Sequence, residues 1–396
     1  MNVKLPFGPA DILLPKSGFE SWACIACDQF TSQPDYWEKA YALAGDAPSC
    51  LHMVLPEVYL ENGGRDVSVE AINATMSRYL AGGIFAEYRD AMILVERSLS
   101  NGKCRRGIVG AFALDEYSYE QGSKPYIRPT EGTVLSRIPP RVEIRKDAPL
   151  ELPHIMVLMD DREQKIIEGI DYSALELLYD FELMLGGGHI RGWLIGRKEQ
   201  QRIMAALEGM MDEVSDPDDR LLFAVGDGNH SLASAKAAAE LIGTAESRWA
   251  LAELVNIHDE AVDFEPIYRV LFDVDVASVT AALHDAFPGS SGRRVDYMGL
   301  GCEGSFFVDG LEAEELQGFI DDYIKTYPQT RVDYIHGEAA VRELSKQENA
   351  LGFIFGGIEK DELFDYVRRK GIFPRKTFSI GHAEDKRYYM EARKIR

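Results

Sequence analysis

Residues 221–236 read LLFAVGDGNHSLASAK, an apolar run followed by a polar turn and then by an alanine-rich segment. The run at 221–225 predicts a short buried strand, and the apolar residues after the turn recur at the spacing of an amphipathic helix. Between them, Gly226 and Gly228 allow the backbone to turn tightly and to approach a ligand closely. We therefore predict a strand–loop–helix unit here, with Ser231 as the N-cap of the helix.

The polar residues of this turn suit a site for an anion. The first N–H groups of a helix lack partners within the helix, and the helix dipole favours negative charge at that end. Asp227 could bind a divalent cation or accept a proton, and His230 could donate to a phosphate oxygen or act as a general acid or base. In the alternative interpretation, Asp227 and Ser231 only cap the helix.

Composition narrows the class of protein. The 396 residues are too many for one ordinary core, so we expect two or three packed subdomains. The net charge of −22 argues against a nucleic-acid surface, because the phosphates would be repelled. No stretch of about 18 apolar residues is present, so we expect no membrane span. Five scattered cysteines form no disulfide framework, and the first residues lack the apolar core of a signal peptide, so we expect a cytoplasmic protein.

The wider chain predicts an α+β or mixed α/β fold. Residues 91–117 hold two apolar runs on either side of an Asn-Gly pair, which is a hairpin signal. Helical spacing covers residues 66–87 and 197–214, and residues 153–161 are typical of a buried strand.

The pattern of apolar and amphipathic segments changes near residue 260. Beyond that point, short apolar runs alternate with amphipathic segments, which is typical of an α/β arrangement. We therefore predict a first mixed α/β region over residues 1–260, which contains the DGNHS turn, and an α/β C-terminal lobe over residues 261–396.

Several stretches resemble one bacterial family. Residues 225–236, VGDGNHSLASAK, are similar to the DGHHRYEAA-type signature of the domain of unknown function family 1015. Further matching stretches follow in the family's order: ACDQFTSQPDYWE (26–38), LPEVYLE (55–61), RPTE (128–131), HIRGWLI (189–195), EPIYR (265–269) and FPRKTF (373–378). The resemblance covers nearly the whole chain, and the ordered set is more specific than any one stretch.

The signature also resembles the phosphate-binding box of the ParB/sulfiredoxin superfamily. Members of that superfamily use ATP or CTP, and an archaeal relative is an ADP-dependent serine kinase. The resemblance therefore implies a ParB/sulfiredoxin-like strand–loop–helix core that cradles the phosphates of ATP or ADP. In a phosphotransferase, Asp227 would hold Mg²⁺ or activate the hydroxyl of the acceptor. Gly228 and His230 match the box, whereas Asn229 replaces its first His or Cys and Ser231 replaces its Arg.

The replaced arginine matters, because Ser231 supplies neither its charge nor its bidentate grip on a phosphate. If a nucleotide binds, positive charge must come from other segments. The candidates are His189, Arg191, Lys236, Arg269, Arg375 and Lys376. The other basic residues near the C-terminus are interpreted as a basic tail that balances an acidic protein: Lys386, Arg387, Arg393, Lys394 and Arg396.

Two further acids are candidates for the site. Asp28 follows a lone C-x-x-C pair, Cys24 and Cys27, which is weak evidence for zinc. The Asp28 side chain is either a second acid in the site or a cap for the helix that begins near Pro34. Glu131 lies in an arginine-rich loop, where it is a general base, a ligand anchor, or part of a solvated salt-bridge cluster.

Three functions follow from these residues. The first is a nucleotide-dependent, kinase-like phosphotransferase that acts on a small hydroxylated metabolite. The second is a non-catalytic module that binds a nucleotide or an anion, and the third is a metal-dependent hydrolase that needs at least one further ligand. The catalytic candidates are Asp28, Glu131, Asp227 and His230, and the ligand-binding candidates are Gly228, Asn229, Ser231, His189, Arg191, Arg269, Arg375 and Lys376.

Overall fold

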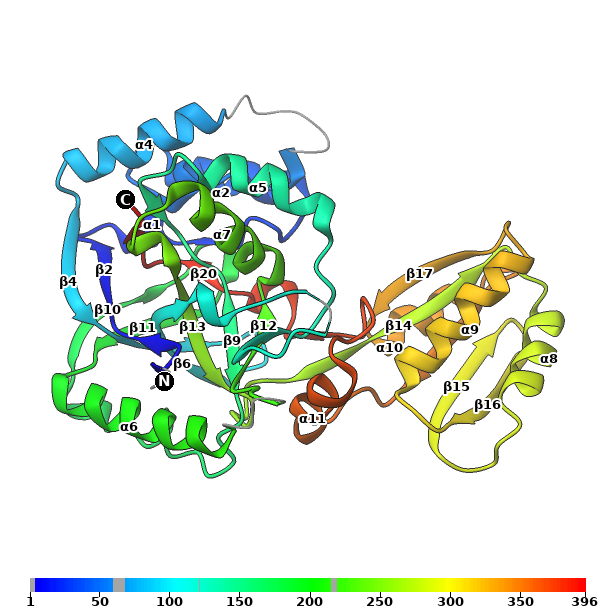
Figure 1. Ribbon diagram of the computed structural model, residues 1–396. Helices are drawn as coiled ribbons and strands as arrows, with labels where there is room; N and C mark the ends of the chain where they lie inside the picture. Colours follow the sequence, from blue (N-terminus) through cyan, green and yellow to red (C-terminus); the bar gives the residue numbers. More distant parts are fainter. Residues whose placement is uncertain (1–3, 60–67, 121, 215–218) are drawn as a thin grey trace. The chain divides into compact units, whose positions relative to one another are not determined.

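The computed structural model describes residues 4–59, 68–120, 122–214 and 219–396, and it divides into two compact units (Figure 1). Unit 1 comprises the chain up to Val262 together with His382–Arg396, and unit 2 comprises Asp263–Gly381. The chain thus returns to unit 1 for its last residues, which the sequence analysis had assigned to the C-terminal lobe. Residues 60 and 61 of the LPEVYLE stretch and residues 66 and 67 of the predicted 66–87 helix lie outside the described residues.

Unit 1 is built on a nine-stranded sheet. Its strands are β1 (Phe7–Gly8), β5 (Ile93–Ser98), β6 (Cys104–Ala113), β7 (Ile127–Pro129), β9 (Met156–Met159), β10 (Glu176–Glu182), β11 (His189–Leu194), β12 (Phe223–Asp227) and β13 (Trp249–Asn256). The strand order is β10-β11-β5-β6-β13-β9-β12-β7, and β1 pairs with β6. The predicted hairpin is confirmed, because β5 and β6 pair antiparallel across the Asn-Gly turn.

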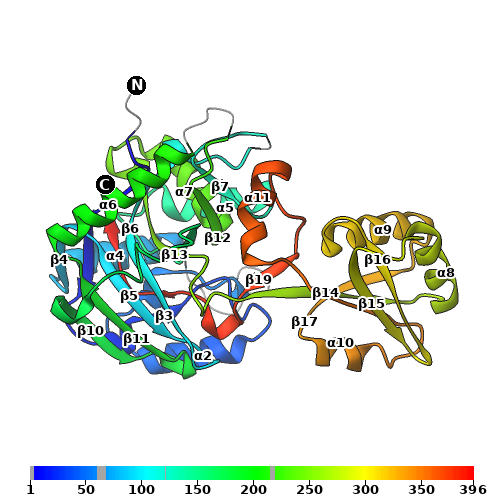
Figure 2. The same ribbon diagram turned by 90° about the horizontal axis from the view of Figure 1, so that it is seen from below.

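Helices cover both faces of this sheet. Neighbouring residues of a strand point to opposite faces, and on β6 Val109 belongs to one hydrophobic core whereas Ile108 belongs to the other. The first core includes residues of α1 (Phe19–Trp22), α2 (Pro34–Ala44) and α4 (Val69–Ala81), and the second includes residues of α5 (Ile138–Arg145), α6 (Arg197–Glu213) and α7 (Asn229–Ile242). In both views α5 lies beside α7, the helix that follows β12 (Figures 1 and 2). The predicted mixed α/β class is confirmed.

Three short strand pairs bring distant segments of unit 1 together. They join β2 (Ala10–Pro15) to β4 (Phe85–Ala91), β3 (Cys24–Ile25) to β20 (Tyr388–Tyr389), and β8 (Leu150–Glu151) to β21 (Arg393–Lys394). The last two pairs place the C-terminal residues beside segments from the first half of the chain. The interpretation as a basic tail is wrong for Arg387 and Arg393, which are buried, whereas Lys394 and Arg396 are exposed.

The predicted helix at 66–87 is shorter than its apolar spacing indicated. Helix α4 ends at Ala81, and the residues from Phe85 onward form β4. Gly83 has a φ of 64°, which lies in the left-handed region that ends helices. A local glycine pair therefore outweighed the periodicity of the flanking residues.

Unit 2 contains a six-stranded sheet. Its strands are β14 (Phe264–Phe272), β15 (Arg293–Gly299), β16 (Cys302–Val308), β17 (Arg331–His336), β18 (Leu351–Phe355) and β19 (Phe378–Ile380). They run in the order β16-β15-β18-β14-β17, and β19 pairs with β14. Within this unit, α8 (Val276–Ala286) and α9 (Glu312–Thr326) lie on one face of the sheet and α10 (Glu338–Leu344) on the other, with α11 (Lys360–Lys370) following β18 (Figure 2). None of the helices among the described residues has the length and apolar character needed to cross a membrane.

Candidate functional site

The turn between β12 and α7 depends on a glycine. Gly228 is the N-cap of α7, and its φ of 78° lies in the left-handed region that side chains rarely adopt. A Cβ atom at this position would lie 3.0 Å from the Cα atom of Ile155. The helix begins at Asn229, so Ser231 is its third residue and the prediction that Ser231 is the N-cap is wrong. The positive end of α7 therefore lies directly after the polar turn.

Asp227 has a partner for each carboxylate oxygen. The N–H of Gly228 donates to Oδ1 at 2.9 Å, and the ammonium of Lys386 lies 3.2 Å from Oδ2. Both side chains are largely shielded from water, with 21% of Asp227 and 11% of Lys386 exposed. Lys386 lies just before β20, so the C-terminal segment brings a positive charge to the start of α7.

Asp28 is a second acid on which the charge of Lys386 acts. Its Oδ2 lies 3.7 Å from Nε2 of His154, and its Oδ1 accepts a hydrogen bond of 3.0 Å from Gln29. Burial raises the pKa of Asp28, but the charge of His154, hydrogen bonds from His154 and Gln29, and the charge of Lys386 outweigh burial and hold the pKa below its usual range. Asp28 does not cap α2, whose N-cap is Gln33. Asp28 is therefore an ionised carboxylate within the site, and its side chain is 29% exposed.

His154 connects Asp28 to three further side chains. Its Nε2 lies 3.2 Å from Oγ of Ser231, and its Nδ1 lies 2.8 Å from the hydroxyl of Tyr389. That hydroxyl donates to Sγ of Cys27 at 3.0 Å, so its single proton is used and Nδ1 of His154 donates to it. Nε2 therefore faces both Asp28 and Ser231. Burial, with the charge of Asp28, raises the pKa of the Cys27 thiol to about 11, which keeps it protonated at neutral pH.

The loop after β7 lies against the start of α7. Strand β7 pairs in parallel with β12, and the hydroxyl of Thr130 donates to the carbonyl of Val225 at 2.7 Å. The N–H of Val134 donates to Nε2 of His230 at 3.1 Å, so this nitrogen is an acceptor and the proton of the neutral ring is on Nδ1. Glu131 lies between these two contacts in the sequence and is partly buried. The structure thus brings the loop that carries Glu131 to the DGNHS turn.

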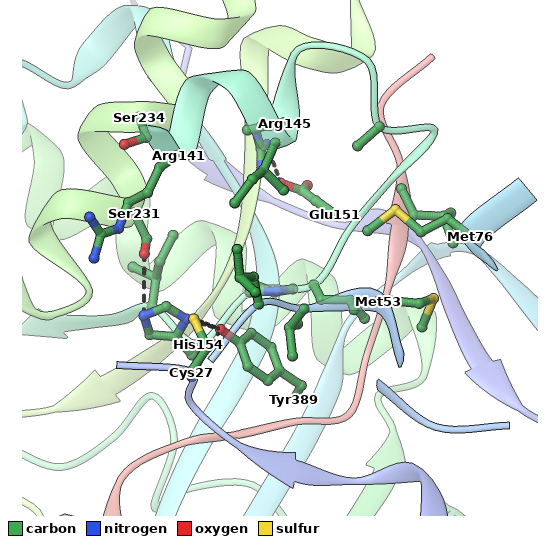
Figure 3. Close-up of a pocket in the computed structure, with 18 of the residues that line it drawn as sticks. Cys27, Met53, Met76, Arg141, Arg145, Glu151, His154, Ser231, Ser234 and Tyr389 are labelled. Atoms are coloured by element: carbon green, nitrogen blue, oxygen red, sulfur yellow. Dashed lines mark hydrogen bonds and ion pairs between the residues drawn. The ribbon is translucent and has the colours of Figure 1, made fainter. Parts of the chain in front are cut away.

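A pocket of about 150 Å³ lies beside this network (Figure 3). Cys27, His154 and Ser231 lie at one end of it, and Met53 and Met76 lie at the other. Most of the remaining lining is apolar. The side chain of Asp28 is adjacent, because its neighbour Cys27 and its partner His154 both line the pocket.

His189 and Arg191 lie elsewhere in unit 1. They belong to β11, which is separated from β12 by β5, β6, β13 and β9 in the sheet. Nδ1 of His189 lies 2.7 Å from Glu182, and Arg191 lies 3.3 Å from Asp180, both on the neighbouring strand β10. Arg191 also lies 3.6 Å from Glu96 of β5, so the positive charge of these two residues is directed to β10 and β5 and not to the turn.

The other predicted sources of positive charge have different surroundings. Arg269, Arg375 and Lys376 belong to unit 2, outside the unit that contains the turn. Arg269 is buried and donates to the carbonyl of Lys376 at 2.9 Å, which is a structural role within unit 2. The Lys236 ammonium donates to the carbonyl of Leu114 at 3.2 Å.

Sequence reasoning missed three residues of the site: His154, Lys386 and Tyr389. The strand predicted over residues 153–161 contains His154 but gives it no role in the site, and the basic-tail interpretation of Lys386 does not bring it there. The tyrosine pair at 388–389 is an aromatic run near a chain end, which is the one local signal that the C-terminal segment is buried.

The next question is whether side chains near Asp227 could hold a metal ion. Among residues 4–59, 68–120, 122–214 and 219–396, no group of three or more His, Cys, Asp or Glu side chains is placed to hold a metal ion. Both oxygens of Asp227 already have partners, Gly228 and Lys386. In this arrangement the residues around Asp227 do not fit Mg²⁺.

Three solved structures resemble this chain in part. Free serine kinase in complex with AMP has a TM-score of 0.39 and 13% identity, with 72% of this chain and 91% of that chain covered. A mutant of free serine kinase in complex with ADP has a TM-score of 0.40 and 12% identity, with the same coverage of 72% and 91%. SbnI with C-terminal truncation from Staphylococcus aureus has a TM-score of 0.37 and 9% identity, with 69% and 82% covered. Likeness at this level identifies no shared ligand or activity.

No curated protein matches this chain. The ParB/sulfiredoxin resemblance stays a prediction. A family model, in contrast, matches residues 8–371, which include the DGNHS turn and the ordered stretches from residue 26 to residue 269. The chain belongs to the family described as "Protein of unknown function (DUF1015)".

Proposed function

We propose that this protein is a phosphotransferase that moves a phosphoryl group from a nucleotide to a hydroxyl group of a small metabolite. The observation that carries the proposal is the alternation of charge at the start of α7, where Lys386 lies 3.2 Å from Asp227 and its charge lowers the pKa of Asp28. Phosphoryl transfer needs a seat for phosphate charge and a group that takes the proton of the acceptor, and is otherwise catalysed by positioning.

The phosphate seat combines the start of α7 with Lys386. The first N–H groups of the helix point along its axis toward the turn, at the positive end of its dipole. Ser231 has no charge, and Lys386 supplies one from a different segment, 3.2 Å from Asp227. A lysine binds a phosphate as a point charge, without the bidentate geometry of an arginine. Either ATP or ADP could be the donor, since the seat recognises phosphate oxygens.

Asp28 is the group that accepts the proton. It is ionised, it is 29% exposed, and it lies beside the pocket. Asp227 is less suited to this role, because its ion-pair partner Lys386 lies at 3.2 Å, nearer than His154 lies to Asp28, and its side chain is only 21% exposed. His154 acts as a positioning residue that holds Asp28 through Nε2. His230 accepts a hydrogen bond from Val134 and so holds the loop that carries Glu131 against the start of α7.

The transfer forms one bond to phosphorus and breaks another. The hydroxyl oxygen of the acceptor forms a bond to the terminal phosphorus of the nucleotide. The bond from that phosphorus to the bridging oxygen breaks, and its electron pair stays on the departing nucleotide. The proton of the hydroxyl passes to Asp28. No step is assigned to Mg²⁺, because the residues around Asp227 do not fit it in this arrangement.

A titration combined with a turnover assay tests the proposal. ATP and ADP are titrated into the full chain by calorimetry, and phosphorus NMR then follows each nucleotide with a pool of hydroxylated metabolites. We expect D28N to keep nucleotide binding and to lose at least about 100-fold in kcat, which is the usual contribution of a general base. We expect K386M to weaken nucleotide binding at least about tenfold, as loss of a charged contact does.

Matched variants control for general effects of charge. D35N changes an exposed aspartate in the first turn of α2, and K394M changes a lysine that is 46% exposed. Both should behave as the wild type. Binding without turnover of any acceptor would favour the non-catalytic module, and a folded wild type that binds neither nucleotide would overturn the proposal.

A further inference from the structure

We infer that the pocket beside His154 holds an apolar group of the phosphoryl acceptor, so that the acceptor is an alcohol with an aromatic or branched aliphatic substituent about the size of a benzene ring. The inference rests on the proposed function, because it assigns the substrate class of the same site. It is argued from the size of the pocket, its lining, its charges and its position relative to Asp28.

Size and lining set the chemistry of the substituent. The pocket has a volume of about 150 Å³. An apolar cavity of about this volume can hold a benzene molecule. Its apolar lining includes Met53, Leu55, Met76, Ile144, Leu150 and Ile155. These six side chains carry no hydrogen-bonding group, so the part of a ligand that lies against them is apolar.

The charged residues of the lining do not call for a charged substituent. Arg141 forms an ion pair with Glu57, and Arg145 forms one with Glu151. All four residues line the pocket. Because each guanidinium is matched by one carboxylate, these four residues carry no net charge that would attract a carboxylate or phosphate of the ligand. A neutral substituent enters without the desolvation cost of a charged one.

The polar end of the pocket orients the acceptor. His154 lines the pocket and lies 3.7 Å from Asp28, and Ser231 lines it from the first turn of α7. An alcohol whose apolar group fills the pocket therefore places its hydroxyl between the proposed base and the proposed phosphate seat. The base of a nucleotide is a poorer occupant, because its edge carries donors and acceptors that the apolar side chains do not match.

Ligand binding is measured separately from turnover. Fluorine NMR follows a fluorinated benzyl alcohol with the full chain, with and without ATP, and glycerol serves as the polar comparison. We expect the benzyl alcohol to bind whether or not ATP is present. In the turnover assay, we expect kcat/KM for benzyl alcohol to exceed that for glycerol at least about tenfold, as burial of a ring of this size predicts.

Two variants change the space in the pocket. I144W fills it from a partly buried position on α5, and I84W makes the same change at a partly buried position outside its lining. We expect I144W to weaken binding of the benzyl alcohol at least about tenfold while ATP binding stays within about twofold, and I84W to leave both unchanged. L55A enlarges the pocket and should improve binding of a naphthyl methanol relative to benzyl alcohol.

The outcomes separate the two proposals. If the fluorinated alcohol does not bind, if ATP displaces it, or if glycerol is the better acceptor, the assignment of the pocket is overturned even when the protein transfers phosphate. If the alcohol binds and I144W abolishes binding, but no alcohol is phosphorylated, the phosphotransferase proposal fails and the acceptor role fails with it, while the pocket remains an apolar ligand site.

Discussion

The β12–α7 turn and the segment His382–Arg396 both supply residues to the candidate site, but different forces hold them. The turn is local, because Gly228 adopts a left-handed conformation and a helix begins at the next residue. The C-terminal segment is held by partners far away in the chain. Arg387 donates to Glu253 at 2.8 Å and to the carbonyl of Pro153 at 2.7 Å, and Tyr389 pairs with Cys24 in a strand register. A site can therefore combine one half that follows local backbone rules with another that depends on long-range burial.

The largest predicted effect tests the long-range half. In R387M, two carboxylates that are at most 2% exposed, Glu253 and Glu391, lose a shared cation. Breaking a buried pair in this way costs about 3–5 kcal/mol of unfolding free energy. Denaturant unfolding measures the loss. K394M in the same segment, 46% exposed, should cost less than about 0.5 kcal/mol. Equal losses in the two variants would show that buried charge does not hold this segment.

The next effect tests the local half. G228A places a side chain at a φ of 78° and brings its Cβ to 3.0 Å from Ile155. Left-handed backbone costs about 1–2 kcal/mol for a residue with a side chain, and crowding adds about 1–3 kcal/mol. G243A is the matched control at the other end of α7, with a φ of 72° and no atom within 4 Å of its Cβ. In G243A the unfolding free energy should fall only by the cost of the left-handed backbone. A loss as large as that of G228A would contradict the close approach of residue 228 to Ile155.

A smaller effect tests the hydrogen bonds by which His154 links Ser231 of α7 to Tyr389 of the C-terminal segment. S231A removes the partner of His154 at 3.2 Å and should lower the unfolding free energy by about 1 kcal/mol. S234A removes a hydroxyl that donates to the carbonyl of His230 in its own helix, at 2.7 Å, and should cost less. Thermal unfolding of both variants compares them. An unchanged S231A would show that the bond to His154 adds nothing to stability.

The smallest effect appears in the pH dependence of stability. The pKa of Asp28 is lower in the folded protein than its ordinary value of about 3.9 in an unfolded chain. The unfolded chain thus binds the proton more readily, so ionised Asp28 stabilises the fold above about pH 4. This contribution is lost as the pH falls from about 4 through the folded pKa. The stability of the wild type should therefore fall more steeply than that of D28N between about pH 4 and pH 3, and parallel urea titrations would contradict the ion pair with His154.

Local patterns predicted much of the fold. The hairpin of β5 and β6, the strand β9, the amphipathic helix α6 and the strand–loop–helix around Asp227 are present where periodicity and turn residues indicated. The errors are also local in origin. The apolar spacing at 66–87 predicts one helix across the glycine pair that ends α4, and the residue type of Ser231 predicts an N-cap that Gly228 forms instead.

The candidate site was only half predictable. Asp227, Gly228 and His230 adjoin in the sequence, and the RPTE loop meets them because β7 pairs with β12. His154, Lys386 and Tyr389 carry no motif, and they reach the site only through the pairing of β20 with β3 and of β9 with β12.

The sequence by itself determined the local units of this protein, because side-chain periodicity and glycine conformation act over a few residues. The tertiary structure alone decided which charges meet. Lys386 pairs with Asp227, Asp28 lies beside His154, and Arg387 is buried between two glutamates. An isolated charge is costly to bury, so such residues come together only where strands from distant parts of the chain place an opposite charge within reach.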